Sequence, residues 1–230
     1  MPARKGVFSV KKNISFAYKG AEREKLKDVY YQMKNDKVGM IGLCDGVSTQ
    51  KYSDVGAYEV QKAIWIMLEK MVDFSNITKY ELKFRIGCVI NETLYRLSKQ
   101  YECEEECFAS TLMLVIFAME NDFYWTVHIG DGVIGIVDDN SKVKILSSPE
   151  NGVTKQYTYT TTSGNLMKRI RIEEHYEKGF VFMMTDGISN ELERNKKYIE
   201  YLKTKNWKRF ENELLSDNIS DDIGFNGMDI

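Results

Sequence analysis

The sequence contains few of the residues that mark several common protein classes. It has two prolines, two histidines and four cysteines among its 230 residues, and four cysteines in a chain of this size do not make a disulfide framework. It also has no internal repeat and no long Gly/Ser-rich linker. With 43% apolar residues it is long enough to bury a two-layer core, so we expect a single domain over residues 1–230.

An excess of charge of one sign is absent as well, since 32 basic residues face 34 acidic ones. This balance argues against a sequence-wide attraction to nucleic acid or to an anionic membrane. No window approaches the roughly 18 apolar residues of a membrane span, and residues 1–8 lack the apolar core of a signal peptide. We therefore predict a cytoplasmic protein without a nucleic-acid or membrane partner, in which any phosphate recognition is local.

Cysteine and histidine do not combine into a metal motif. Cys103 and Cys107 flank three glutamates, but no histidine lies near them. We expect reduced thiols at a solvated helix end here rather than a zinc site. The sequence also argues against a Rossmann or a P-loop fold, because neither G-x-G-x-x-G nor G-x-x-x-x-G-K-[ST] follows a predicted strand.

The sequence does contain a recurring pattern, in which an apolar run ends at an Asp-Gly pair. The pairs are Asp45-Gly46, Asp131-Gly132 and Asp186-Gly187. Each run reads as a buried strand whose end delivers a carboxylate into a turn, and several such carboxylates could hold a hard divalent cation. The alternative is that each Asp-Gly is only a tight turn.

The first half of the chain predicts strands followed by two helices. Residues 7–18 read as a strand, and residues 28–33 pair with the strand that leads to Asp45, which brings Asp28 near Asp45 across the hairpin. Apolar residues at helical spacing predict a helix over 54–72. A second helix runs from Thr78, with a capping box, to about Tyr101.

The second half predicts mainly strands. Four antiparallel strands form a meander over residues 108–146, and residues 147–168 form an exposed, mobile flap that selects substrates. Further strands are expected at 170–174, 180–185 and 222–230, with charged helices over 190–215 that break near Asn206. Strands and helices do not alternate, which predicts an α+β fold with antiparallel sheets inside and helices outside.

Five motifs in this order resemble the metal-dependent type 2C (PPM) serine/threonine protein phosphatases, and look most like the divergent bacterial branch. The matching segments are Arg23 with Asp28, residues 43–46, residues 109–111 with 129–132, residues 184–187, and residues 220–223. The resemblance implies a four-layer α-β-β-α sandwich with two central antiparallel sheets. It also implies a cofactor of two Mg²⁺ or Mn²⁺ ions, with a possible third.

The resemblance further implies roles for individual residues. Asp45 would bridge two ions and act in catalysis, and Arg23 would bind the phosphate, for which a planar guanidinium is well suited. Asp222 remains an alternative to Asp221 as the last ligand, because adjacent strand residues point opposite ways. The implied metal ligands are Asp28, Asp45, the Gly46 carbonyl, Asp131, Asp186 and Asp221.

The function implied is hydrolysis of phosphoserine and phosphothreonine in proteins by a metal-activated water. The partners would be phosphorylated proteins and a cognate kinase or its targets. The chain departs from the family in Leu26-Lys27 before Asp28, in Val47 after Gly46 and in the lack of an Arg after Gly132. Two alternatives stay open: an inactive relative that binds phosphoproteins as a regulatory module, and a phosphatase for a small phosphorylated metabolite.

Overall fold

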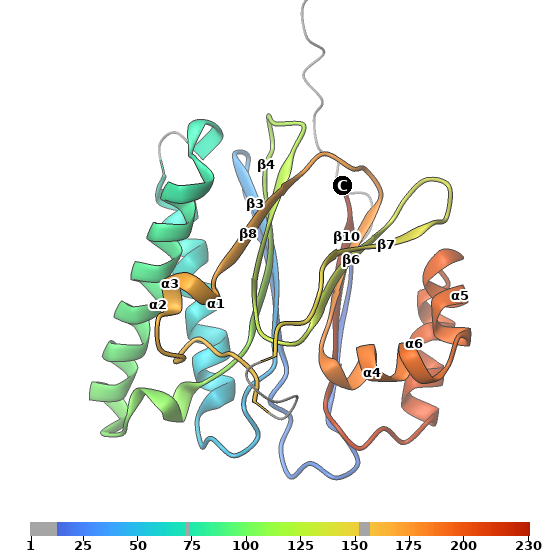
Figure 1. Ribbon diagram of the computed structural model, residues 1–230, viewed down its shortest axis with the longest axis horizontal. Coiled ribbons are helices and arrows are strands. Elements are labelled where there is room, and N and C mark those ends of the chain that lie inside the picture. The colour runs from blue at the N-terminus through green and yellow to red at the C-terminus, as the bar shows by residue number, and fades with distance from the viewer. Residues whose placement is uncertain (1–12, 72–73, 152–156) are drawn as a thin grey trace, which may run out of the picture.

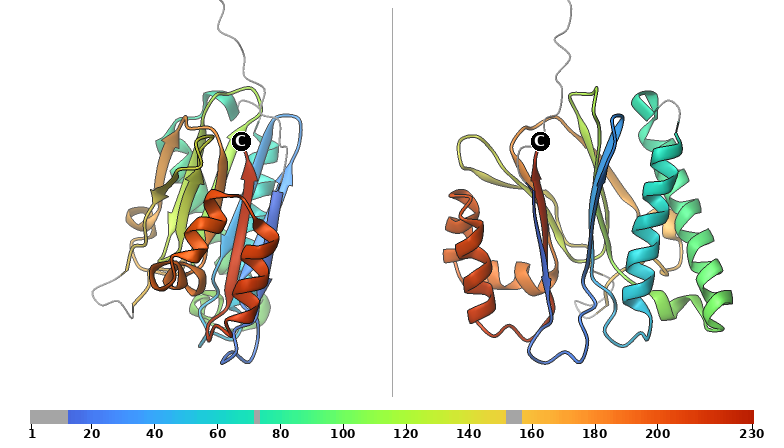
Figure 2. Two further views of the ribbon diagram at one scale, coloured as in Figure 1. Left: turned by 90° about the vertical axis from the view of Figure 1, so that its right-hand side faces the viewer. Right: turned by 180° about the vertical axis from the view of Figure 1, so that it is seen from behind.

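The computed structural model describes residues 13–71, 74–151 and 157–230 of the chain. These residues form two five-stranded antiparallel sheets that lie face to face, with helices covering both outer faces (Figures 1 and 2). The predicted four-layer α+β sandwich is confirmed. Predicted residues 7–12 of the first strand lie outside the described part of the chain.

The first sheet has the strand order β2-β3-β4-β5-β8. Its strands are β2 (Val29–Lys34), β3 (Val38–Cys44), β4 (Leu112–Ala118), β5 (Tyr124–Ile129) and β8 (Arg171–His175). Helices α1 (Ser53–Lys70) and α2 (Lys79–Tyr101) cover its outer face (Figure 1). The predicted capping box is present, because the Thr78 side chain accepts a hydrogen bond from the Glu81 amide.

The second sheet has the order β1-β10-β9-β6-β7. Its strands are β1 (Asn13–Tyr18), β10 (Ile223–Asp229), β9 (Phe180–Met184), β6 (Val133–Val137) and β7 (Val143–Ser147). Its outer face is covered by α4 (Asp186–Arg194), α5 (Lys197–Lys203) and α6 (Trp207–Ser216) (Figure 1). The first and last strands of the described chain are therefore neighbours in one sheet.

Three apolar layers hold the sandwich together, and β4 shows how the sequence supplies two of them. Its residues are all buried, and they alternate between two clusters. Leu112, Leu114 and Ile116 face α1 and α2, whereas Met113, Val115 and Phe117 face the second sheet. A strand that is apolar on both faces is the expected pattern for a sheet covered on both sides. The third layer lies between the second sheet and α4 to α6.

The predicted meander over 108–146 is wrong in two respects. The chain crosses from one sheet to the other between β5 and β6, so β6 pairs with β9 and β7 rather than with β5. Local alternation of side chains carries no information on which sheet a strand joins, which explains the error. In addition, residues 105–108 form a short 3₁₀ helix, η2 (Glu105–Phe108), and β4 begins only at Leu112.

The C-terminal helices differ from the prediction mainly in their start. The first begins at Asp186 rather than near residue 190, directly after β9. The predicted break at Asn206 is confirmed, since its side chain accepts from the Arg209 amide as the cap of α6. A second break lies between α4 and α5. Two shorter helices, η1 (Phe74–Asn76) and α3 (Leu166–Arg169), complete the fold. Among the described residues, no helix has the length and apolarity needed to cross a membrane.

Candidate metal centre and substrate cleft

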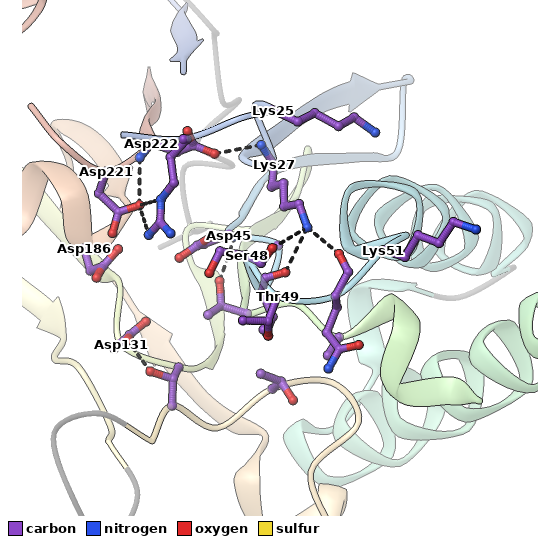
Figure 3. A pocket seen from close by; sticks show the side chains of 18 of the residues that line it. Lys25, Lys27, Asp45, Ser48, Thr49, Lys51, Asp131, Asp186, Asp221 and Asp222 are labelled. Atoms are coloured by element: carbon purple, nitrogen blue, oxygen red, sulfur yellow. Dashed lines mark hydrogen bonds and ion pairs between the residues drawn. The ribbon is translucent and has the colours of Figure 1, made fainter. Parts of the chain in front are cut away.

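A cleft of about 1030 Å³ opens at one end of the sandwich, where the loops after β3, β5 and β9 meet the segment before β10. Four carboxylates line one side of it (Figure 3): Asp45, Asp131, Asp186 and Asp221. They come from four separate parts of the chain. The structure thus brings these predicted ligands together in one cleft.

Asp45 follows β3 and is fixed through its backbone. Its amide donates to the Thr111 hydroxyl at 2.8 Å, and its carbonyl accepts from the Thr111 amide at 2.8 Å. The next residue, Gly46, forms an isolated antiparallel β-bridge with Ser110. The Ser110-Thr111 motif therefore positions Asp45, a role that the sequence motif alone did not reveal.

Asp28 lies beside Asp45, as the hairpin predicted. Val29 pairs with Cys44, so the preceding residue sits opposite Asp45 at the end of the two strands. The Asp28 side chain is only 4% exposed. Its Oδ2 accepts from the Thr185 hydroxyl at 2.8 Å, whereas Oδ1 is buried with no hydrogen-bond partner. A buried carboxylate oxygen without a donor is costly unless a cation or a proton satisfies it.

Asp186 is the first residue of α4, and a glycine behind it allows the close approach to the last strand. A Cβ on Gly187 would lie 2.1 Å from the carbonyl oxygen of Asp222, so only glycine fits there. This packing brings the start of α4 against the segment that carries Asp221. Asp131 comes from the β5–β6 loop, where Gly130 has a φ of +114°, and its carboxylate accepts from the Thr158 hydroxyl.

Asp221 and Asp222 have different environments. Asp222 is 5% exposed; its Oδ1 accepts from the Gly20 amide at 2.9 Å and its Oδ2 from the Lys27 amide at 2.8 Å. Asp221 is half-buried on the cleft side, and its Oδ1 is bonded to the Arg23 guanidinium, with Nε at 2.6 Å. Both Asp222 oxygens thus accept from backbone amides, whereas Asp221 uses Oδ1 for the Arg23 guanidinium and for the Asp222 amide at 2.8 Å. This difference favours Asp221 as the ligand, through its Oδ2.

Arg23 reaches the acids because residues 20–22 run along residues 219–220. The Ala21 amide donates to the Ile219 carbonyl at 2.8 Å, and a Cβ on Gly20 would lie 2.2 Å from the backbone of Asp221. The guanidinium therefore lies within the cleft rather than in bulk solvent, and forms an ion pair with Asp221. Its position is compatible with the predicted phosphate contact.

The carboxylates repel one another strongly. Burial and the neighbouring Asp28 and Asp186 raise the pKa of Asp45 well above its usual range. Burial, followed by the charges of Asp131 and Asp221, raises the pKa of Asp186 to about 6. Burial also raises the pKa of Asp28, to which Asp222 and Asp186 contribute. A nearby cation would stabilise the ionised form of these carboxyl groups.

The donor set suits Mg²⁺ or Mn²⁺, which prefer carboxylate and carbonyl oxygens and keep several waters. Asp28 supplies an unpartnered oxygen, and the cleft lining includes the carboxylates of Asp45, Asp131, Asp186 and Asp221. Within residues 13–71, 74–151 and 157–230, however, no three His, Cys, Asp or Glu side chains are already gathered as a metal cage. The oxygen atoms of these residues fit divalent ions. One of the predicted ligands, Asp221, forms an ion pair with Arg23 in this structure.

The expected flap over 147–168 is only partly exposed. Thr161 is buried; its amide donates to the Ser110 carbonyl at 2.8 Å. Arg169 lies over the Tyr159 ring, 3.6 Å from its centre. Residues 152–156 lie outside the described part of the chain. The end of this segment is thus tied to the motif that positions Asp45, whereas the sequence predicted an exposed loop because its Thr-rich composition is polar.

The two histidines lie away from the acids. His128 is buried; its Nδ1 lies 2.8 Å from the Ser147 hydroxyl and 2.9 Å from an Arg171 nitrogen. His175 is 2.9 Å from the Thr126 hydroxyl. Burial lowers the pKa of both imidazoles. Both histidines are buried and neither is among the residues that line the cleft.

Known proteins resemble this chain in both sequence pattern and fold. The sequence model of the protein phosphatase 2C family matches residues 24–221. Similar solved structures include the serine/threonine phosphatase of S. agalactiae, with 18% identity, a TM-score of 0.74 and coverage of 95% of this chain and 99% of that one. Stp1 from Staphylococcus aureus has 12% identity, a TM-score of 0.71 and coverage of 100% and 98%.

A third similar structure is the catalytic domain of the serine/threonine protein phosphatase PstP, in complex with two manganese ions. It has 14% identity, a TM-score of 0.70, and coverage of 95% of this chain and 97% of that one. No curated protein matches the chain significantly. At these identities the solved structures show the shared fold, and the family match identifies the class.

The chain belongs to the protein phosphatase 2C family. It is accordingly an enzyme of the protein serine/threonine phosphatase class, and the metals of that class are Mg²⁺ and Mn²⁺.

Proposed function

We propose that this protein hydrolyses phosphoserine and phosphothreonine in phosphorylated proteins, using two Mg²⁺ or Mn²⁺ ions bound in the cleft. The observation that carries the proposal is the group of carboxylates with raised pKa values around Asp45, with the Arg23 guanidinium beside it. The manganese ions of the similar PstP domain support it. The proposed ligands are Asp28, Asp45, the Gly46 carbonyl, Asp131, Asp186 and Asp221, with Asp131 and Asp186 on a weaker third ion.

Bound ions would supply charge neutralisation and a water of lowered pKa, the two needs of phosphate ester hydrolysis. The remaining work falls to the chain. Thr111 keeps the Asp45 backbone in place, and Asp28 lies beside Asp45 at the end of the hairpin. Arg23 would exchange its Asp221 partner for the substrate phosphate, to which a guanidinium can donate two parallel hydrogen bonds.

The similar serine/threonine protein phosphatases support a protein substrate over a small metabolite, and the size of the cleft is compatible with it. Its volume of about 1030 Å³ is at the upper limit of typical small-molecule pockets, which occupy roughly 300 to 1,000 Å³. Exposed polar side chains such as Ser48 and Thr49 lie along its rim. We therefore propose phosphorylated proteins as substrates. The partner reaction would be carried out by a protein kinase that phosphorylates the same proteins.

The test is a Mn²⁺ titration of the full chain with p-nitrophenyl phosphate and with a phosphothreonine peptide. We expect hydrolysis of both that rises with Mn²⁺ and disappears with EDTA. Hydrolysis that is independent of divalent ions would contradict the metal mechanism. Binding of the peptide without hydrolysis would contradict the enzyme and support the regulatory alternative.

A further inference from the structure

We propose that Lys27 is a positioning residue of the metal centre, which holds the Gly46 carbonyl and the turn that follows it. The inference rests on the proposed metal function, in which the Gly46 carbonyl is a ligand. Lys27 stands directly before Asp28, where the chain departs from the acidic or amide residue usual in the family. Its side chain lies on the opposite side of the cleft from the acids (Figure 3).

The Lys27 ammonium is surrounded by backbone carbonyls. Its Nζ donates to the Ser48 carbonyl at 2.8 Å and to the Val47 carbonyl at 3.3 Å, and it also donates to the Gln50 carbonyl. An ammonium has three N–H donors, so all three are used inside one turn. The four-carbon side chain thereby spans from the start of β2 to the loop after β3.

The Lys27 backbone fixes the same region from two sides. Its carbonyl accepts from the Gly46 amide at 3.2 Å, and its amide donates to Asp222 Oδ2 at 2.8 Å. A Cβ on Gly46 would lie 3.0 Å from the Lys27 carbonyl oxygen. One residue therefore links the Asp45-Gly46 strand end with Asp222, the neighbour of the proposed ligand Asp221.

These contacts determine the orientation of the Gly46–Val47 peptide. The Gly46 amide is held by the Lys27 carbonyl, and the Val47 amide donates to the Ala109 carbonyl at 3.0 Å. Further along the turn, the Lys27 ammonium donates to the carbonyls of Val47, Ser48 and Gln50. Without the ammonium, the Val47 carbonyl would keep the Gln50 amide at 3.0 Å and the Gln50 carbonyl would keep the Ser53 hydroxyl at 3.3 Å. The Ser48 carbonyl would lose the Lys27 donor, so the turn would be held by fewer bonds. The Gly46–Val47 peptide, whose carbonyl is a proposed ligand, would then be held less firmly beside the cleft that Gly46 lines.

The experiment compares Lys27→Met with Lys197→Met in the full chain. Lys197 is the control, because its ammonium likewise has several acceptors, here the carboxylates of Glu213 at 2.9 Å and Asp217 at 3.1 Å. These groups lie in α5, in α6 and directly after α6, away from the cleft. Mn²⁺ affinity is measured by calorimetry, thermal stability by circular dichroism, and exchange of the amides of residues 46–52 by deuterium uptake.

We expect Lys27→Met to weaken Mn²⁺ binding about tenfold or more, as is typical when an outer-shell partner of a metal site is removed. Exchange of the 46–52 amides should rise. Lys197→Met should lower stability to a similar degree while leaving Mn²⁺ affinity within twofold. If Lys27→Met fails to fold, Lys27→Gln, which keeps an amide donor, takes its place under the same criteria.

The outcomes separate this inference from the proposed function. Mn²⁺ affinity of the Lys27 variant within twofold of wild type overturns the positioning role, even if the enzyme is active. Mn²⁺ binding by the wild type without phosphatase activity contradicts the proposed function but leaves the Lys27 comparison valid. A wild-type chain that binds no Mn²⁺ overturns both.

Discussion

The two walls of the cleft differ in how their polar groups are bonded. On the turn wall, residues 22–27 and 47–50, the Lys27 ammonium and several backbone amides have partners within the chain. On the acid wall, Asp45, Asp131, Asp186 and Asp221, the carboxylates face one another and the pKa values of Asp45 and Asp186 are raised. The turn wall is thus organised without a ligand, whereas the acid wall holds charge that a cation would stabilise.

The largest expected effect is on the acid wall. Asp45→Asn and Asp186→Asn should each reduce Mn²⁺-dependent hydrolysis of p-nitrophenyl phosphate by on the order of 10³-fold, since each removes charge that holds the proposed ions and the transition state. The fold should survive, because the substitution relieves repulsion between carboxylates. Turnover near the wild-type value at saturating Mn²⁺ in either variant would show that this wall is not the metal centre.

The adjacent residues Asp221 and Asp222 allow the same comparison at neighbouring positions. Asp221 faces the cleft as a proposed ligand, whereas Asp222 accepts from backbone amides. Asp221→Asn should weaken Mn²⁺ binding by about tenfold or more, as expected for loss of a metal-site partner, with little change in stability. Asp222→Asn replaces an acceptor of the Gly20 and Lys27 amides, so it should lower the free energy of unfolding by roughly 1 to 3 kcal/mol.

Calorimetry with Mn²⁺ and urea unfolding of the two variants give the required measurements. The reverse pattern, with the affinity loss in Asp222→Asn, would assign the last ligand to Asp222.

Next in size is the pH dependence of the metal-free protein. Asp186 titrates at about 6 in the fold, against an ordinary 3.8. A raised pKa in the folded state means that the contribution of Asp186 to stability is fully present below pH 4 and is lost as pH rises through about 6. One pKa unit corresponds to about 1.4 kcal/mol. For Asp186 alone we expect a loss of roughly 2 kcal/mol, less than the full shift would give, because solvent screens part of the interaction.

Urea unfolding in EDTA from pH 4 to 8 measures this loss, and Asp186→Asn is the control in which the corresponding slope should be smaller. Identical pH profiles for the two proteins would argue against repulsion at this position. Added Mn²⁺ should restore wild-type stability at high pH, because a ligand of the folded state stabilises it.

The smallest expected effect concerns Arg23, which crosses from the turn wall to the acid wall. Arg23→Ala should raise KM for a phosphopeptide about tenfold, at the low end of the energies of charge-assisted hydrogen bonds, with a smaller loss in kcat. Arg23→Lys should recover only part of this, since an ammonium cannot form the paired contact. An unchanged KM would show that the ion pair with Asp221 is the only role of Arg23.

Sequence reasoning located the acids but not the residues that fix them. The runs before Asp45 and Asp186 are local patterns, and the Asp28–Asp45 hairpin follows from a short turn, so both were predictable. The choice between Asp221 and Asp222 depends on amides about 200 positions earlier, at Gly20 and Lys27. No local pattern encodes such a contact.

The same limit explains why the meander was wrong and why the contact of Thr161 with Ser110 was not predicted. The crossing from β5 to β6 and the burial of Thr161 both depend on where distant strands lie. The polar composition of the flap indicated exposure, but the hydroxyl and amide groups of Thr161 are bonded to Ser110 instead. Polar residues can be buried where the backbone of another segment satisfies them.

The position of β10 between β1 and β9 has a consequence for biosynthesis. A chain emerging from the ribosome exposes β1 before the other described strands, but the strand that pairs with it is the last one described. Until β10 emerges, β1 lacks its neighbour and Arg23 lacks Asp221. The cleft is therefore completed only after the segment from Asp221 through β10 has emerged, so a nascent chain that stops before residue 219 carries most of the acids but lacks the Arg23–Asp221 ion pair.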